Sequence, residues 1–239
     1  MASAIDPQPA IDPKPMSRST AILYAIGSPL FLVALVFVPA GRIDWIPGWI
    51  FIVVLVGALG LSTLLMTRLN PIIFRARSRF QPGTKIWDLV LVAVLLPAMV
   101  AEIPVATLDA GRMRWSEVPL WVVLLGYALL LGSIAVTTWA QAVNPYFEPG
   151  VRIQEERAQH VISSGPYKFV RHPGYSAAIV MFVAMPLALA SWWALLPAAL
   201  ASALLVVRTG LEDSLLRAEL SGYADYARRT RHRLVPGLW

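Results

Sequence analysis

Long runs of apolar residues, separated by short charged segments, dominate the sequence. Four of these runs cover residues 21–40, 46–66, 87–106 and 119–141. Each run approaches the roughly 20 residues that an α-helix needs to cross about 30 Å of hydrocarbon at about 1.5 Å per residue. The pattern therefore predicts four membrane-spanning helices.

A fifth apolar stretch, about residues 175–210, is too long for a single span. It is interrupted at Ser191-Trp192-Trp193, where two adjacent indole rings suit the interface between lipid and water. We therefore expect two short helices in a tight hairpin, which brings the expected number of spans to about six. The predicted fold class is all-α, a polytopic membrane helix bundle with a C-terminal helical hairpin.

Composition supports a single membrane domain. The hydrophobic fraction is 57% and the charged fraction is 14%, against about 45–50% and about 25% in soluble domains. The 239 residues are too few for two large soluble domains beside a membrane region. We divide the chain into a flexible tail with four prolines over residues 1–20, a four-helix membrane region over 21–141, and a C-terminal region over 142–239.

The basic residues are distributed unevenly between the two sides of the predicted bundle. Of 20 Lys and Arg residues, only Arg42, Arg112 and Arg114 lie in the first and third loops or at the hairpin tip, and the other seventeen lie on the opposite side. Cytoplasmic loops of membrane proteins carry such an excess, so we expect both termini and the 142–174 loop to be cytoplasmic. The net charge of +6 then needs no nucleic acid, because no basic helix or aromatic stacking motif accompanies it.

The sequence also limits the kinds of catalytic site. It has no cysteine, which excludes disulfides, thiolate metal ligands and a cysteine nucleophile. His160, His172 and His232 are too far apart in sequence for a paired helical metal site, so we expect no metal.

The most informative polar residues flank the predicted hairpin. Residues 165–175 read Gly-Pro-Tyr-Lys-Phe-Val-Arg-His-Pro-Gly-Tyr, and Glu212-Asp213 follows the hairpin. Pro173 suits the first turn of a helix, which would place Arg171 and His172 just before a helix N-terminus, where free N–H groups and the helix dipole favour anions. The planar guanidinium of Arg171 can also bind two oxygens of one carboxylate or phosphate.

If the hairpin folds back on itself, this anion clamp faces the carboxylate pair across one pocket. Such an arrangement suits a zwitterionic ligand, and S-adenosylmethionine, with its α-carboxylate, α-ammonium and sulfonium groups, is one. Nearby aromatic residues can stack on adenine or face the sulfonium through a cation–π contact; they are Tyr167, Tyr175, Tyr223 and Tyr226.

Spacing alone leaves a second interpretation open. Arg208 and Glu212 are four residues apart, as are Asp213 and Arg217. Residues at this spacing are neighbours on a helix surface, so both pairs can be ordinary ion pairs with no role in ligand binding.

The ordered set of motifs resembles the isoprenylcysteine carboxyl methyltransferase family of integral-membrane enzymes. In that family a Gly-Pro-Tyr, an Arg-His-Pro-x-Tyr, an apolar hairpin, a Glu-Glu pair and a Tyr-containing tail ending near a proline follow one another. The matching elements here are Gly165-Pro166-Tyr167, Arg171-His172-Pro173-Gly174-Tyr175, Glu212-Asp213, Tyr223-Ala224-Asp225-Tyr226 and Leu234-Val235-Pro236. The resemblance covers roughly residues 144–239, whereas residues 1–140 carry no matching motif.

The resemblance implies an S-adenosylmethionine-dependent membrane methyltransferase with a cytoplasmic cofactor pocket, formed by residues 142–239. Its acceptor would be lipophilic, such as a prenylcysteine-like carboxylate, and its partners would be lipids or lipidated substrates. Carried over by position, the catalytic residues are Arg171, His172 and Glu212. The cofactor-binding residues are Gln154, Tyr167, His172, Tyr175, Glu212, Asp213, Tyr223 and Tyr226. Because the second acid is Asp rather than Glu, we expect Glu212 to be the principal contact.

Two other functions remain as alternatives. One is an NADPH-dependent membrane reductase of a sterol-like lipid, although an acidic pair opposes the 2′-phosphate of NADPH. The other is a non-catalytic membrane protein in which these charged groups only set topology. The sequence leaves the oligomeric state and the nucleophilic atom of the acceptor open.

Overall fold

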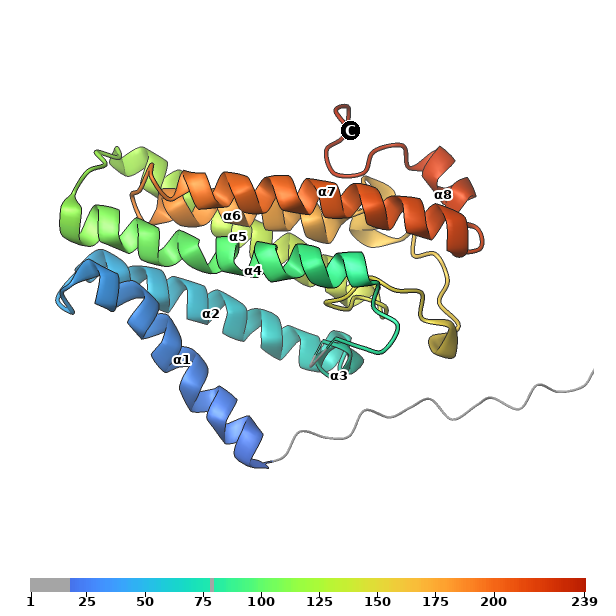
Figure 1. The fold of residues 1–239 in the computed structure, drawn as a ribbon, viewed down its shortest axis with the longest axis horizontal. Helices are drawn as coiled ribbons and strands as arrows, with labels where there is room; N and C mark the ends of the chain where they lie inside the picture. Colours follow the sequence, from blue (N-terminus) through green and yellow to red (C-terminus); the bar gives the residue numbers. More distant parts are fainter. Residues whose placement is uncertain (1–17, 78–79) are drawn as a thin grey trace, which may run out of the picture.

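The computed structural model describes residues 18–77 and 80–239, which form helices joined by loops, without strands. Its helices are α1 (Arg18–Ala40), α2 (Ile46–Leu69), α3 (Ile72–Ala76), α4 (Ile86–Thr107), α5 (Leu120–Val143), α6 (Pro173–Ala188), α7 (Leu195–Glu219) and α8 (Tyr223–Arg229). Helices α2, α4, α5, α6 and α7 run along one common direction, whereas α1 lies obliquely to them and its N-terminal end projects away from the bundle (Figure 1). The predicted all-α fold is confirmed. Of the tail predicted over residues 1–20, residues 1–17 lie outside the described residues, and residues 18–20 begin α1.

Four helices of the described chain are long and apolar enough to cross a membrane. They are α2, α4 together with the π-helical turn η1 (Leu108–Met113) that continues it, α5 and α7. The apolar helices Gly27–Ala40 and Pro173–Ala188 are shorter. Many large apolar side chains on the long helices are exposed, Val53 and Val90 by more than 60%. A soluble protein rarely exposes so much apolar surface, so this surface suits contact with lipid.

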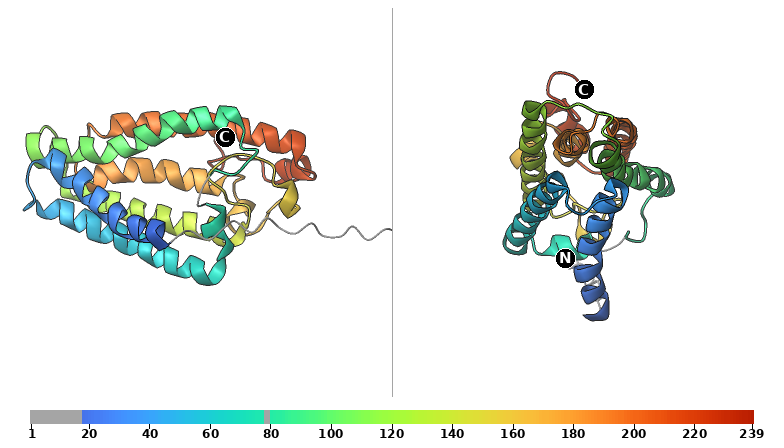
Figure 2. Two further views of the ribbon diagram at one scale, coloured as in Figure 1. Left: turned by 60° about the horizontal axis from the view of Figure 1, so that its bottom comes forward. Right: turned by 90° about the vertical axis from the view of Figure 1, so that its left-hand side faces the viewer.

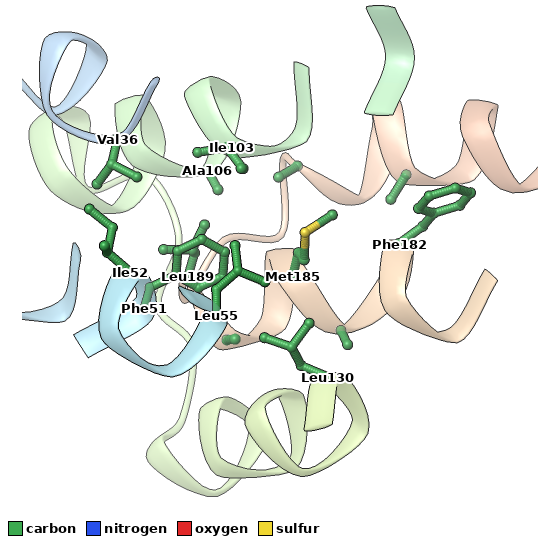
Figure 3. Close-up of a cluster of buried hydrophobic side chains, with 14 of the residues drawn as sticks. Val36, Phe51, Ile52, Leu55, Ile103, Ala106, Leu130, Phe182, Met185 and Leu189 are labelled. Carbon is green, nitrogen blue, oxygen red and sulfur yellow. The ribbon is translucent and has the colours of Figure 1, made fainter. Parts of the chain in front are cut away.

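The hydrophobic core lies between these helices and is closely packed. Side chains from α1, α2, α4, α5 and α6 meet in one cluster, which includes Phe51, Leu130 and Phe182 (Figure 3). The closest approach is at Gly126 of α5, where an added Cβ would lie 2.4 Å from the backbone nitrogen of Ala188 in α6. Only a residue without a side chain fits at this crossing, because backbone atoms cannot move aside cheaply.

The predicted hairpin forms, but its two halves are unequal. Helix α6 begins at Pro173 as expected and has 16 residues, whereas α7 has 25 and continues through Glu212 to Glu219. The apolar pattern ends near residue 210, but the following Leu-Glu-Asp-Ser-Leu-Leu-Arg-Ala-Glu is rich in helix-forming residues, and it places Asp213 in a buried position. The end of the apolar run therefore marks the end of the apolar surface and not the end of the helix.

The two ends of the bundle differ in chemistry. One end carries the loops after α1, η1 and α6, and it gathers Trp45, Trp115, Trp192 and Trp193. There the buried carboxylate of Asp109 accepts hydrogen bonds from the hydroxyls of Ser116 and Ser191, each at 2.5 Å, which fastens the hairpin turn to η1. The other end carries the long loop between α5 and α6, together with α8 and the C-terminal segment (Figure 2).

Candidate active site

A pocket lies at the polar end of the bundle, where α6 begins and α7 approaches its last turns. The space between its walls is about 870 Å³ when it is counted out to the solvent at its mouth. Eight of the nine residues that the sequence predicts for the site line it: Gln154, Tyr167, Arg171, His172, Tyr175, Glu212, Tyr223 and Tyr226. The ninth, Asp213, does not. The loop after α5 supplies further lining residues, among them Asn144, Tyr146, Arg152 and His160.

Glu212 presents a carboxylate to the pocket from α7. Its Oε2 accepts a hydrogen bond of 2.5 Å from the hydroxyl of Tyr175, in the first turn of α6. Its Oε1 receives no hydrogen bond from the described residues, and the side chain is only partly buried. Glu212 is therefore an acceptor with free capacity that faces the pocket.

His172 occupies the N-cap position of α6, beside Tyr175. The imidazole ring lies parallel to the ring of Tyr175, with centroids 5.7 Å apart and planes 2° apart. Its Nε2 lies 3.4 Å from the hydroxyl of Tyr223 and 3.5 Å from Oδ1 of Asp213. The ring is thus held between two aromatic residues and a carboxylate at the edge of the pocket.

Asp213 is fully buried behind the pocket wall and joins three arginines. Arg171 donates to both its oxygens, at 2.7 and 3.1 Å, while Arg217 and Arg233 each donate to Oδ2 at 3.0 Å. The hydroxyl of Tyr223 donates to Oδ1 at 2.9 Å. The predicted helix pair of Asp213 and Arg217 is therefore present, but it is one contact within a larger buried cluster.

The remaining donors of Arg171 bind the C-terminal segment. Its Nη1 donates to the carbonyl oxygens of Thr230 and Arg231, at 2.8 and 2.7 Å. Although burial disfavours the charged guanidinium, the hydrogen bonds with Asp213 raise the pKa of Arg171 above its usual value. Arg171 thus stays charged, and its side-chain donors connect the start of α6 to α7 and to the C-terminal segment.

Hydrogen bonds within the loop shape the opposite wall of the pocket. Gln154 donates from its amide to the carbonyl of Tyr146 and accepts from Arg157, at 2.8 and 2.7 Å. The amide of Asn144 donates to the hydroxyl of Tyr167 at 2.8 Å. The polar atoms of Gln154 are thus largely used within the loop.

The buried tyrosines offer ring faces more than free hydroxyls. Tyr226 donates its hydroxyl to the carbonyl of Tyr167 at 2.7 Å, and its ring meets Tyr223 edge to face at 5.6 Å. Burial raises the pKa of Tyr226 to about 12 and also raises that of Tyr167. These phenols therefore stay neutral, and their rings give the pocket an aromatic lining.

One buried ion pair that supports the pocket was not predicted. Asp88 in α4 accepts two hydrogen bonds from Arg208 in α7, at 2.6 and 3.0 Å, and a third from the backbone N–H of Val151 at 2.8 Å. Arg208 also donates to the carbonyl of Pro149 and lies 5.4 Å from the ring centre of Tyr175. Arg208 therefore pairs with Asp88 and not with Glu212. The available signal was the presence of both charges within apolar runs.

A comparison with protein families matches the part of the chain that forms much of the pocket. Residues 121–220 match the model of the phospholipid methyltransferase family, a stretch that begins in α5 and includes the loop, α6 and α7. No curated protein sequence matches the chain. The resemblance to integral-membrane methyltransferases is confirmed, although the match names phospholipid and not isoprenylcysteine carboxyl methyltransferases. The family match covers residues 121–220 of the 239, and four long apolar helices of the described chain are compatible with a membrane protein.

Proposed function

We propose that the protein transfers a methyl group from S-adenosylmethionine to a lipophilic acceptor in the membrane. The observation that carries this proposal is the open carboxylate of Glu212 within an aromatic pocket at one end of the apolar bundle. When bound, S-adenosylmethionine supplies an electrophilic methyl group on a sulfonium. The pocket offers groups that match its cationic parts, because a carboxylate attracts an ammonium and aromatic ring faces attract cations.

The residues of the pocket take different roles in this proposal. Glu212 binds the cationic amino-acid end of the cofactor, and Tyr175 orients that carboxylate through its short hydrogen bond. The rings of Tyr167, Tyr223 and Tyr226 cover the cofactor and exclude water. The hydrogen bonds of Arg171 to Asp213 and to the carbonyl of Thr230 make it a positioning residue, which holds His172 and the C-terminal segment in place.

In this proposal, His172 is the residue that takes part in the transfer itself. Methyl transfer from a sulfonium is an in-line displacement that needs alignment and a desolvated nucleophile. When the acceptor is an amine or a thiol, one proton leaves its nucleophilic atom as the new bond to carbon forms. The imidazole at the pocket edge is the group suited to accept that proton; a carboxylate acceptor would have no proton to lose.

The position of the pocket supports a membrane-resident acceptor. The pocket lies where α6 begins and α7 leaves its apolar stretch, so the transferred group would meet the acceptor near the membrane surface. An acyl or prenyl anchor concentrates an acceptor at that depth, because each buried methylene contributes about 0.8 kcal/mol. The NADPH-dependent reductase is not favoured, since the family match is to methyltransferases.

Calorimetry on the purified protein tests the cofactor assignment. We expect Glu212→Gln to weaken S-adenosylmethionine binding roughly ten- to a hundredfold, because hydrogen bonds to charged groups contribute about 1.5–3 kcal/mol. The matched control is Glu219→Gln on the same helix, whose carboxylate bonds Lys85 alone among the described residues and lies outside the pocket. Unchanged affinity in the Glu212 variant, with an unchanged melting temperature, would refute the assignment.

A further inference from the structure

The segment that follows α8 has two chemically distinct sides. Five consecutive backbone carbonyls, from Thr230 to Leu234, accept hydrogen bonds from the pocket motif. The donors are Nη1 of Arg171 to the first two carbonyls, the backbone N–H groups of Arg171 and His172 to the next two, and the hydroxyl of Ser176 to the last, all between 2.6 and 2.9 Å. This inner side therefore fixes the geometry of the pocket wall.

The outer side of the same segment is basic. Residues 228–233 read Arg-Arg-Thr-Arg-His-Arg. Arg233 bonds Asp213, and Arg228 bonds Asp225. Arg229 and Arg231 are exposed, and neither bonds a carboxylate in the part of the chain that the structure describes. Two guanidinium groups are thus presented outward directly behind the pocket.

Apolar side chains follow the basic ones. Leu238 is 79% exposed and Val235 is 47% exposed. The ring of Trp239 stacks on Arg233 at 4.7 Å and lies beside Gly210 of α7. Neighbouring α7 positions Val207 and Leu211 belong to the exposed apolar surface of the bundle. The apolar end of the segment therefore continues the surface that faces lipid.

We propose that residues 228–239 dock onto an anionic membrane surface and that this docking stabilises the cofactor pocket. A basic cluster beside a membrane helix attracts anionic headgroups, and Leu and Trp next to it insert at the interface. The five carbonyls of the inner side accept hydrogen bonds from Arg171, His172 and Ser176. A segment that is docked on the membrane therefore keeps these residues in place and keeps the pocket closed at the wall that they form. The docking itself is independent of the proposed function, whereas its effect on cofactor binding rests on it.

A probe on the segment tests the docking. The chain has no cysteine, so Leu238→Cys gives a single site for a polarity-sensitive fluorophore. The labelled protein is reconstituted in phosphatidylcholine vesicles, alone or mixed with phosphatidylglycerol. We expect the emission to shift to the blue as the anionic fraction rises and the shift to weaken with added salt, because salt screens surface charges. Equal emission in both kinds of vesicle would overturn the docking.

Charge variants test whether the fluorescence response to anionic lipid depends on Arg229 and Arg231. We expect Arg229→Gln with Arg231→Gln to reduce the docked-to-free ratio by about fivefold per arginine. The matched control is Arg112→Gln with Arg114→Gln, which removes the same charge at the other end of the bundle. An equal effect of both double variants would overturn the assignment to this segment, as would a response that needs a soluble acidic protein in place of the lipid.

Cofactor affinity tests the coupling. We expect S-adenosylmethionine to bind several-fold more tightly in the anionic vesicles, and the Arg229 and Arg231 double variant to lose this gain. Docking without any gain in affinity would overturn the coupling. If no vesicle supports S-adenosylmethionine binding at all, the proposed function fails, while the fluorescence result still decides the docking.

Discussion

At the scale of single residues, the adjacent acids Glu212 and Asp213 have different structural roles. Neighbouring positions on a helix point in directions about 100° apart and do not share a face. Glu212 faces the pocket and bonds Tyr175, whereas Asp213 faces away from it and bonds Arg171. A motif that reads as one acidic pair is therefore divided between a ligand-facing carboxylate and a structural one.

Because Asp213 is buried, we expect the loss of its carboxylate to lower the stability of the protein more than the loss of the Glu212 carboxylate does. Removing one partner of a buried ion pair costs about 3–5 kcal/mol, because the other charge stays buried without compensation. We expect Asp213→Asn to lie near the lower end of this range, since Asn keeps one acceptor oxygen. The measurement is the melting temperature of the detergent-solubilised protein, which should fall clearly below that of the unchanged chain.

Two comparisons sharpen this prediction. Glu219→Gln, in an exposed pair with Lys85 on the same helix, should change stability by less than about 1 kcal/mol. Glu212→Gln should leave the melting temperature nearly unchanged while weakening cofactor binding. A stable Asp213→Asn protein with lost cofactor binding would instead place Asp213 in contact with the ligand.

At the scale of helices and loops, the Asp88–Arg208 pair connects the bundle to the pocket. It joins α4 to α7 and holds the loop at Pro149 and Val151 by two backbone hydrogen bonds. The same loop carries the pocket wall around Gln154. The pair therefore sets where that wall lies, although Asp88 is not among the residues that line the pocket.

This arrangement predicts an effect of Asp88 on a distant wall. In Asp88→Asn we expect faster amide hydrogen exchange in residues 144–154 and several-fold weaker binding of S-adenosylmethionine, because the loop loses a charged anchor. Lys85→Gln is the matched control, since Lys85 also links the start of α4 to α7 but through an exposed pair with Glu219. Unchanged exchange in the loop would contradict a positioning role for Asp88.

The helices themselves were predictable from the sequence, whereas these pairings were not. An apolar run of membrane length indicates a helix without further information, and the proline at residue 173 marks where α6 begins. The partner of Arg208 depends on how α4 and α7 are rotated about their axes, which spacing along one helix cannot reveal. The order of the motifs was enough to predict eight residues that line the pocket. It could not show that Asp213 lies behind the pocket wall.

At the scale of the whole molecule, the two ends of the bundle match the two sides of a membrane. One end gathers tryptophans and holds Arg42, Arg112 and Arg114. The other end holds the pocket and most of the remaining Lys and Arg residues. Aromatic residues at an interface and basic residues on the cytoplasmic side are both typical of membrane proteins. A pocket on the cytoplasmic side would also meet a soluble methyl donor.

This charge asymmetry predicts that the pocket end is cytoplasmic, and single cysteines can test it in this cysteine-free chain. Ser164, near the pocket, and Glu117, at the tryptophan-rich end, are both exposed. Glu117 is preferable to its neighbour Ser116, whose hydroxyl bonds Asp109. In intact cells we expect an impermeant thiol reagent to modify Glu117→Cys and to reach Ser164→Cys only after the membrane is opened. Labelling of both positions after opening shows that each thiol is reactive. Modification of Ser164→Cys from outside an intact cell would reverse the orientation, and the cofactor would then have to reach the pocket from the opposite side.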